Sequence, residues 1–199
     1  MDRKVKAHFK KVDPKLFAAF LKVGELELAT TRVPKEYFPA LCREIIAQQL
    51  SGKVVQVIFE RFQNLFPKKQ ITPKFLLKLD DKILRATGMS NSKTKFLKDL
   101  AKKVESKEIC LKELEDLDSE SVIEKLIKVK GIGRWTAEMF LIFCLGREDV
   151  FSFGDLGLNK AVRKIYGLEK ATKEEMEKIV SKWSPYRSYA ARILWRSLD

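Results

Sequence analysis

A glycine turn near the middle of the chain offers backbone groups that could bind a phosphate. Residues 130–134 read KGIGR, and we expect permissive backbone at both glycines with one apolar side chain between them. The next helix begins near residue 134 or 135, and its first amide N–H groups have no partner within the helix. These amides and the positive end of the helix dipole favour a phosphate, and Lys128, Lys130 and Arg134 add positive charge. The alternative is an ordinary turn between two antiparallel helices.

A second stretch, FSFGDLGLNKA over residues 151–161, places a carboxylate among glycines. Asp155 lies just ahead of residues with helical character. This is the position of an N-cap, where a side-chain oxygen accepts hydrogen bonds from the first amides of the helix. The local pattern alone therefore predicts a structural role for Asp155.

The elements that must position these stretches are predicted to be helices throughout. Ser121 with Glu124 predicts a capping box for the helix before the glycine turn. The helix after the turn is apolar on nearly all sides, which predicts burial. No stretch shows the alternation of β-branched residues that is typical of strands, so we expect an all-α fold. Further helices are expected after Asp13-Pro14, from about Pro39 to Leu50, from Gly52 to Phe66, after Thr72, after Asp80, over residues 90–104, from Asn159 to Tyr166, after Thr172 and after Pro185.

The charge balance indicates a polyanionic partner. The chain has 40 Lys and Arg against 27 Asp and Glu, a net charge of +13. Five lysines lie on the helix over residues 90–104, and we interpret them as a solvated face. There is no long apolar stretch and no signal-peptide core, so we expect no membrane association. The expected location is the cytoplasm with the nucleoid, or the nucleus of a eukaryote.

The cysteines and the single histidine argue against a metal site made of side chains. Cys42, Cys110 and Cys144 are widely spaced and odd in number, which predicts neither a disulfide framework nor a metal cluster. Cys42 and Cys144 lie in apolar helical runs and are expected in the core. His8 belongs to residues 1–12, which we interpret as a flexible basic arm.

Four motifs in order resemble the helix-hairpin-helix (HhH-GPD) DNA glycosylase superfamily, in particular its alkylbase (3-methyladenine DNA glycosylase II) branch. The hairpin LIKVKGIGRWTAEMF is followed by VFSFGDLGLNKAV, the loop with its aspartate. IIAQQLSGKVV is similar to the family's DNA-inserting segment, and KWSPYRSYAARILW to its C-terminal helix. The resemblance covers about residues 13–198.

The resemblance implies that Asp155 is the catalytic carboxylate of a glycosylase that flips alkylated purines out of double-stranded DNA. A carboxylate beside the sugar stabilises an oxocarbenium-like transition state electrostatically. Bifunctional relatives have a nucleophilic lysine where this chain has Trp135. Because an indole cannot form a Schiff base, we expect hydrolysis that leaves an abasic site without cutting the strand.

The resemblance also suggests residues for the base pocket and for the wedge that fills the gap in the stack. Trp135 and Tyr186 fall where related enzymes place aromatic walls, although Trp135 could instead be a core residue and Tyr186 a packing residue at a helix start. Met139 replaces an aromatic residue found in some bacterial relatives. Gln49 or Leu50 is the candidate wedge, and the alternative is an ordinary helix C-terminus.

The family's phosphate-binding hairpin corresponds to Lys130, Gly131, Ile132, Gly133, Arg134, Trp135 and Thr136. The phosphate contacts are assigned to the amides of Ile132, Gly133 and Trp135. Similar hairpins hold K⁺ or Na⁺ on backbone carbonyls, which here would lie near Ile127–Val129. We expect no side-chain metal ligands, no other cofactor and no iron–sulfur cluster.

We predict one catalytic unit over residues 13–199 with two lobes and a DNA-binding cleft between them. Lobe one covers about 38–150, including the hairpin at 121–145, and lobe two covers about 13–37 with 151–199. The protein is expected to be a monomer. One rival hypothesis is a non-catalytic helix-hairpin-helix DNA-binding module. Another is a glycosylase for oxidised or mismatched bases.

Overall fold

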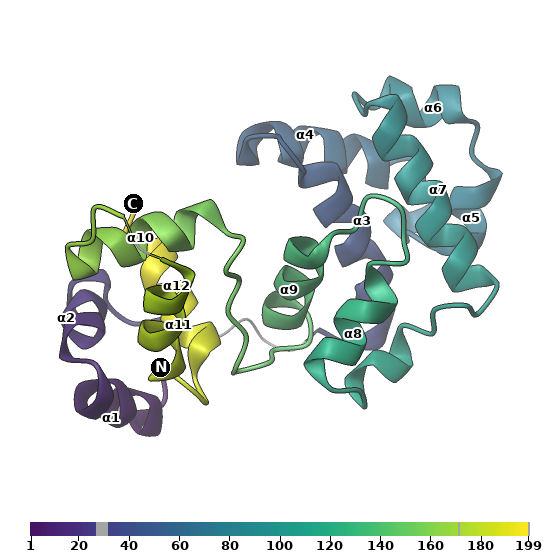
Figure 1. Ribbon diagram of the computed structural model, residues 1–199. Coiled ribbons are helices and arrows are strands. Elements are labelled where there is room, and N and C mark those ends of the chain that lie inside the picture. Colours follow the sequence, from purple (N-terminus) through teal and green to yellow (C-terminus); the bar gives the residue numbers. More distant parts are fainter. Residues whose placement is uncertain (27–31, 171, 199) are drawn as a thin grey trace. The chain divides into compact units, whose positions relative to one another are not determined.

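The computed structural model describes residues 1–26, 32–170 and 172–198, and every regular element in these ranges is a helix (Figure 1). The predicted all-α class is confirmed. Two compact units divide the chain: unit one is Met1–Thr30 with Leu141–Asp199, and unit two is Thr31–Phe140. The boundaries predicted from the sequence were 37/38 and 150/151, so both observed boundaries lie earlier in the chain. None of the described helices is long and apolar enough to cross a membrane.

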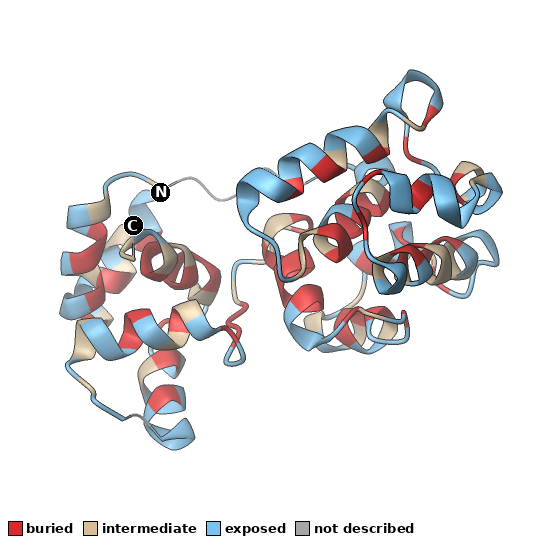
Figure 2. Cartoon of the chain, turned by 90° about the horizontal axis from the view of Figure 1, so that it is seen from above, coloured by how far each residue is buried: buried red, intermediate tan, exposed pale blue. Residues whose placement is uncertain are grey.

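The described part of unit one contains helices that share a single hydrophobic core. They are α1 (Arg3–Val12), α2 (Pro14–Val23), α10 (Leu156–Tyr166), α11 (Lys173–Ser181) and α12 (Arg187–Arg196). Figure 2 shows buried residues along one side of these helices and exposed residues along the other. This is the amphipathic pattern that drives short helices to pack, because propensity alone does not hold them.

The prediction of a flexible arm at residues 1–12 is wrong. Residues 3–12 form α1, whose start is capped by the Asp2 carboxylate accepting from the Lys4 amide at 2.8 Å. Val5 and Phe9 are almost fully buried in the core of unit one. These two residues stand four apart and so lie on one helix face. The basic residues around them (Arg3, Lys4, Lys6, Lys10 and Lys11) concealed this narrow apolar stripe in the sequence.

Asp13 joins α1 to α2 and caps α2, as its sequence pattern predicts. One carboxylate oxygen accepts from the Leu16 amide at 3.0 Å. The other accepts from the Trp183 indole at 2.8 Å and from the Tyr166 hydroxyl. Burial, and then the neighbouring Asp13 carboxylate, raise the pKa of Tyr166 above its usual range. Asp13 is therefore a buried carboxylate whose hydrogen bonds are all directed into the core.

Unit two holds the remaining α-helices of the described chain. They are α3 (Tyr37–Ala47), α4 (Gly52–Gln63), α5 (Pro73–Lys78), α6 (Asp81–Ala86), α7 (Asn91–Glu105), α8 (Ser119–Leu126) and α9 (Arg134–Phe143), with 3₁₀ turns at Pro34–Glu36, Pro67–Lys69 and Lys112–Glu115. The last residues of α9 are assigned to unit one. The predicted caps Thr72 and Asp80 are confirmed, because their side chains accept from Phe75 and Lys82 amides. Cys42 and Cys144 are buried as predicted.

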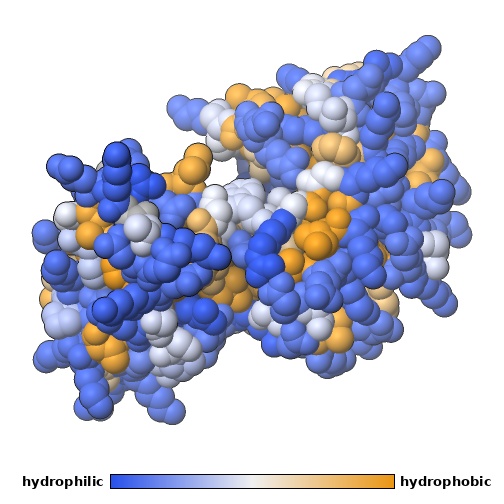
Figure 3. All heavy atoms as spheres, in the orientation of Figure 1, coloured by the Kyte–Doolittle hydropathy of each residue, from blue (hydrophilic) through white to orange (hydrophobic). Residues whose placement is uncertain are grey.

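Some predicted helix ends differ from those observed. The helix α3 ends at Ala47 rather than Leu50, and α4 ends at Gln63 rather than Phe66. The predicted capping box of Ser121 and Glu124 is wrong, because Asp118 caps α8 and accepts from the Glu120 and Ser121 amides. The face drawn in Figure 3 is largely hydrophilic, with apolar patches between the polar side chains.

Candidate active site

Asp155 is the N-cap of α10, as its sequence position predicts. Its Oδ1 atom accepts a hydrogen bond from the Leu158 amide at 2.8 Å and another from the Trp195 indole N–H at 3.2 Å. The residue is only 8% exposed, so it is largely shielded from water. A charge in such a place acts strongly on its surroundings, because the local dielectric is lower than that of water.

Gly157 provides the space that this arrangement needs. A β-carbon added there would lie 3.1 Å from Oδ1 of Asp155 and 3.5 Å from Cδ1 of Trp195. The backbone of Gly157 is not in the left-handed region, so the need for glycine here is steric and not conformational. A larger residue at position 157 would press on the bond between Trp195 and Asp155.

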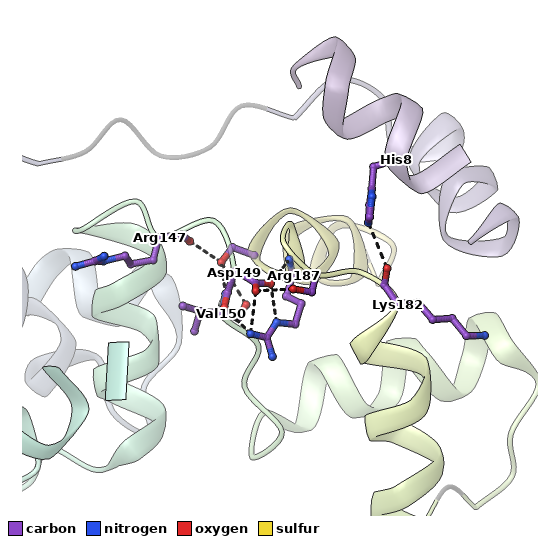
Figure 4. Close-up of polar contacts among 8 residues, drawn as sticks. His8, Arg147, Asp149, Val150, Lys182 and Arg187 are labelled. Atoms are coloured by element: carbon purple, nitrogen blue, oxygen red, sulfur yellow. Dashed lines mark hydrogen bonds and ion pairs between the residues drawn. The ribbon is translucent and has the colours of Figure 1, made fainter. Parts of the chain in front are cut away.

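The loop that leads to Asp155 is fastened to the start of α12 (Figure 4). The Ser188 hydroxyl donates to the Arg147 carbonyl at 2.6 Å and accepts from the Val150 amide at 3.0 Å. The Arg187 guanidinium binds the Asp149 carboxylate, with Nε 2.6 Å from Oδ1. The loop is thus held on the same helix that carries Trp195.

Asp149 is held in its charged form by these contacts. Burial alone would raise the pKa of this carboxyl, but the Arg187 guanidinium and the Ser184 hydroxyl outweigh it, so the pKa lies below its usual range. Beyond Val150 the chain turns inward, and Phe151 packs edge-on against Trp183 with ring centres 5.6 Å apart. Asp155 therefore follows a segment with little freedom to move.

Trp195 is included in the C-terminal motif, but the sequence does not predict a role for it. It lies in the RILW segment of the C-terminal motif, but no local pattern pairs it with a residue 40 positions earlier. Its ring lies 5.7 Å from that of Phe143, and the Arg192 guanidinium stands 5.7 Å over the Phe143 ring. Burial lowers the pKa of Arg192. The indole that contacts Asp155 thus packs against the Phe143 ring, which in turn lies under the Arg192 guanidinium.

The glycine turn of unit two differs from the prediction in one respect. Gly131 has φ +83°, and a β-carbon there would fall 2.1 Å from the Phe96 ring, so both conformation and space demand glycine. Gly133 is outside the left-handed region and has open space around its α-carbon. Only one of the two glycines therefore serves the turn itself. Ile132 is buried as the apolar plug that the pattern predicts.

The amides of the hairpin are not all directed outward. The Ile132 N–H donates to the Val129 carbonyl at 3.0 Å, so its predicted role as a phosphate donor is not supported by this geometry. The Lys130 N–H donates to Asp99 at 2.8 Å. The first backbone bond of α9 runs from the Ala137 amide to the Gly133 carbonyl. The amides ahead of it form the positive end of the α9 dipole.

The Arg134 side chain binds carboxylates on α8 and α9, the two helices of the hairpin. Its guanidinium makes two bonds to the Glu120 carboxylate, at 2.6 and 2.8 Å, and a third to Glu138 at 3.1 Å. These carboxylates raise the pKa of Arg134 further above its usual range. Its predicted contact with a phosphate stays a prediction. Lys130 is exposed, whereas Thr136 is buried in the first turn of α9.

The candidate pocket residues lie in both units. Trp135 is 41% exposed, so the alternative of a core side chain is wrong, and Met139 is buried one turn further along α9. Tyr186 is half-buried in unit one and packs edge-on against His8 and Tyr189, with ring centres 5.2 and 5.9 Å apart. Tyr186 thus packs against neighbouring rings at the start of α12, which was the alternative to a role in the pocket.

The candidate wedge residues are on the surface of unit two. Gln49 is exposed and has φ +58°, a left-handed conformation that is uncommon for a residue other than glycine. Leu50 is 37% exposed. Gln48, which sequence reasoning did not single out, is engaged, because its side chain donates to the Gly131 carbonyl at 2.7 Å. Of the two adjacent glutamines, Gln49 is the one presented outward.

The carbonyls proposed for a monovalent ion are partly used within the turn. The Leu126 and Val129 carbonyls accept from the Val129 and Ile132 amides. A carbonyl oxygen has two lone pairs, so such a bond leaves capacity for an ion. Across the described ranges, no group of three or more His, Cys, Asp or Glu side chains could hold a metal.

Comparison with known proteins agrees with this geometry. A family profile described as HhH-GPD superfamily base excision DNA repair protein matches residues 42–185. DNA-3-methyladenine glycosylase 1 of Schizosaccharomyces pombe is 38% identical over 178 residues, which cover 88% of this chain and 78% of that protein.

Two solved structures are similar over nearly the whole chain. The 3-methyladenine DNA glycosylase of Schizosaccharomyces pombe in complex with abasic DNA has a TM-score of 0.87 at 35% identity, covering 96% of this chain and 95% of that one. A DNA-3-methyladenine glycosidase from Bacillus halodurans has a TM-score of 0.84 at 36% identity, with coverage of 98% and 88%.

The all-helical fold, the hairpin and the loop bearing Asp155 thus define a protein of DNA base excision repair. The chain belongs to the HhH-GPD superfamily. Within that superfamily it is a DNA glycosylase, a hydrolase of the N-glycosyl bond.

Proposed function

We propose that this glycosylase removes alkylated purines of the 3-methyladenine and 7-methylguanine type from double-stranded DNA, with Asp155 as its catalytic carboxylate. The observation that supports this most is the largely shielded Asp155 carboxylate, held at the start of α10 by the Leu158 amide and the Trp195 indole. The names of the similar proteins point to the same class of lesion.

One carboxylate is enough for such a substrate. An N3- or N7-alkylated purine carries positive charge and leaves as a neutral base, so a general acid is not required. The bond that breaks joins the base to C1′ of the sugar, and the bonding electrons leave with the base. The Asp155 carboxylate stabilises the resulting oxocarbenium character, and water then adds to C1′. Loss of a stabilising group of this kind costs about 100-fold or more in rate.

Aromatic faces would bind the cationic base. Trp135 presents a partly exposed indole, and each cation–π contact of this kind contributes roughly 0.5–2 kcal/mol. Trp135 is the candidate aromatic residue in unit two, with Met139 one turn further on the same face of α9, and Tyr186 is the candidate in unit one. Because a thioether is smaller and more flexible than an aromatic ring, Met139 allows a wider pocket than a third ring would.

The hairpin supplies the grip on the DNA backbone. The first amides of α9 and the exposed Lys130 would bind a phosphate, and a monovalent cation on the carbonyls near residues 127–129 would add positive charge close by. Gln49 or Leu50 would enter the stack when the lesion leaves it. The protein would act as a monomer.

The proposal excludes strand cleavage by a lyase step. Trp135 occupies the position of the lysine that bifunctional relatives use, and an indole offers no amine for a Schiff base. Product strands should therefore stay intact until alkali is added.

The test is to treat plain duplex DNA with a methylating agent and identify the free bases that the protein liberates. Asp155→Asn should abolish release while leaving DNA binding intact, because asparagine caps a helix as well as aspartate does. Asp80→Asn is the matched control, since Asp80 is also an N-cap aspartate, which accepts from the Lys82 amide at the start of α6. Turnover by Asp155→Asn would remove the carboxylate from the mechanism and favour the rival of a binding module. Release of oxidised bases, with little release of methylated ones, would favour the other rival.

A further inference from the structure

The connection between α3 and α4, residues Gln48–Ser51, carries both candidate wedge residues, and we call it the wedge turn. It is fastened at its first residue. The Gln48 side-chain amide donates to the Gly131 carbonyl at 2.7 Å, across 83 positions in sequence. The Leu50 amide donates to the Ala47 carbonyl at 3.1 Å. The wedge turn is thus bonded directly to the hairpin proposed to grip phosphate.

Lys93 of α7 holds the same turn from another side. Its ammonium group donates to the Ile46 carbonyl at 2.8 Å and to the Gln48 carbonyl at 2.7 Å. These carbonyls lie at the C-terminal end of α3, where helix carbonyls lack partners and the dipole favours a cation. Burial lowers the pKa of Lys93. The prediction of a uniformly solvated lysine face on this helix is therefore wrong at Lys93.

The helix α7 contacts the hairpin at two further positions. The Phe96 ring, one turn beyond Lys93, lies against the α-carbon of Gly131. Asp99, about one turn further, accepts from the Lys130 amide at 2.8 Å. Residues three apart share a helix face. One face of α7 therefore carries the wedge turn at one end and the hairpin along the rest.

We propose that Gln48 and Lys93 are positioning residues that keep the wedge turn in fixed register with the phosphate-binding hairpin. When the hairpin amides hold the backbone, the exposed Gln49 and Leu50 then stand at a set distance from it and enter the gap left by the flipped base. This inference rests on the proposed function, because it needs DNA in which a base leaves the stack. Holding a group within a fraction of an ångström of its working position is a large part of catalysis, and a displacement of about 1 Å costs roughly 100-fold.

The test uses Gln48→Met and Lys93→Met, which keep most of the side-chain length and remove the donors. Lys98→Met is the matched control, because Lys98 lies on the same helix and donates to the Leu77 and Leu79 carbonyls at 3.1 and 2.5 Å. All three variants are compared by thermal unfolding, and both lysine variants lose one charge.

The first measurement is single-turnover release of 7-methylguanine from a duplex and from the same strand left unpaired. Gln48→Met and Lys93→Met should slow release from the duplex by roughly 10- to 100-fold. Release from the unpaired strand should stay close to the wild-type rate, since it leaves no gap to fill. Lys98→Met should match the wild type on both. Equal losses on the two substrates, or no loss on the duplex, would overturn the proposal.

The second measurement needs no catalysis. In an Asp155→Asn background, the fluorescence of 2-aminopurine placed beside the lesion reports unstacking. The rise should be reduced by Gln48→Met and Lys93→Met and unchanged by Lys98→Met. The double variant should lose little more than either single one, because both residues hold one turn. An undiminished rise in the variants would refute positioning, whereas failure of the wild type to release any methylated base would refute the proposed function alone.

Discussion

Removing the indole donor from Asp155 is the sharpest test of the active-site geometry. Trp195→Phe keeps an aromatic ring against Phe143 and deletes the N–H that lies 3.2 Å from Oδ1 of Asp155. The Leu158 amide still donates to that oxygen. The carboxylate therefore stays at the helix start but loses one partner that limits its rotation.

The size of the effect follows from the hydrogen bond. A bond to a charged group contributes about 1.5–3 kcal/mol, and the 3.2 Å length places this one at the lower end. If the whole of that energy holds the carboxylate in its working position, the rate falls by about tenfold, since 1.36 kcal/mol corresponds to a factor of ten. We expect this loss in the single-turnover rate of base release, with a small change in the binding of lesion DNA.

Trp183→Phe is the matched control. It deletes an indole N–H that donates to Asp13, another N-cap aspartate of the same unit, at 2.8 Å. Trp183 is fully buried, so this change should lower the free energy of unfolding by roughly 2–4 kcal/mol, as a buried truncation that also leaves a carboxylate short of a donor. Its folded fraction should release bases at the wild-type rate. A wild-type rate for Trp195→Phe, or the same loss per folded molecule in both variants, would refute the reasoning.

Three further outcomes follow from the structure. Gly131→Ala should destabilise the protein by more than about 1 kcal/mol, because residue 131 has a positive φ and its added β-carbon would meet the Phe96 ring. Gly133→Ala should leave stability unchanged and weaken DNA binding. Urea unfolding measures the stability of each variant, and a binding titration measures its affinity for DNA. Asp149→Asn should lower the free energy of unfolding at neutral pH by less than about 1 kcal/mol. This difference should vanish on acidification from about pH 5 downward, because the stability from a carboxylate with a lowered pKa is lost as the pH falls through its pKa in the folded protein. Urea unfolding at several pH values measures the difference, and a difference that does not change with pH would show that the pair with Arg187 contributes nothing. Binding to lesion DNA should weaken steeply with salt, and a flat plot of log affinity against log salt would contradict phosphate contacts by the hairpin.

Two aspartates show how far local patterns reach in this chain. Asp13 and Asp155 both precede helices, and both cap them as the sequence predicts. Each also accepts from a tryptophan indole that is far away in sequence. Asp13 also accepts from the Tyr166 hydroxyl and is 4% exposed, whereas Asp155 is 8% exposed. In the sequence, only the motif around Asp155 distinguishes it from Asp13. In the folded protein, the two aspartates differ in the distant side chains that donate hydrogen bonds to them.

Local sequence patterns predict the all-α class, most helix starts and the motifs of the family, because caps, glycine stops and apolar spacing act over a few residues. They do not determine the packing of α1, the bond between Trp195 and Asp155, or the fastening of the wedge turn by Gln48 and Lys93. Those features depend on which distant groups a buried donor or apolar stripe meets after folding. An amide, an ammonium group or an indole N–H has no preferred partner in the linear chain, and only the packed helices decide where its hydrogen bond goes.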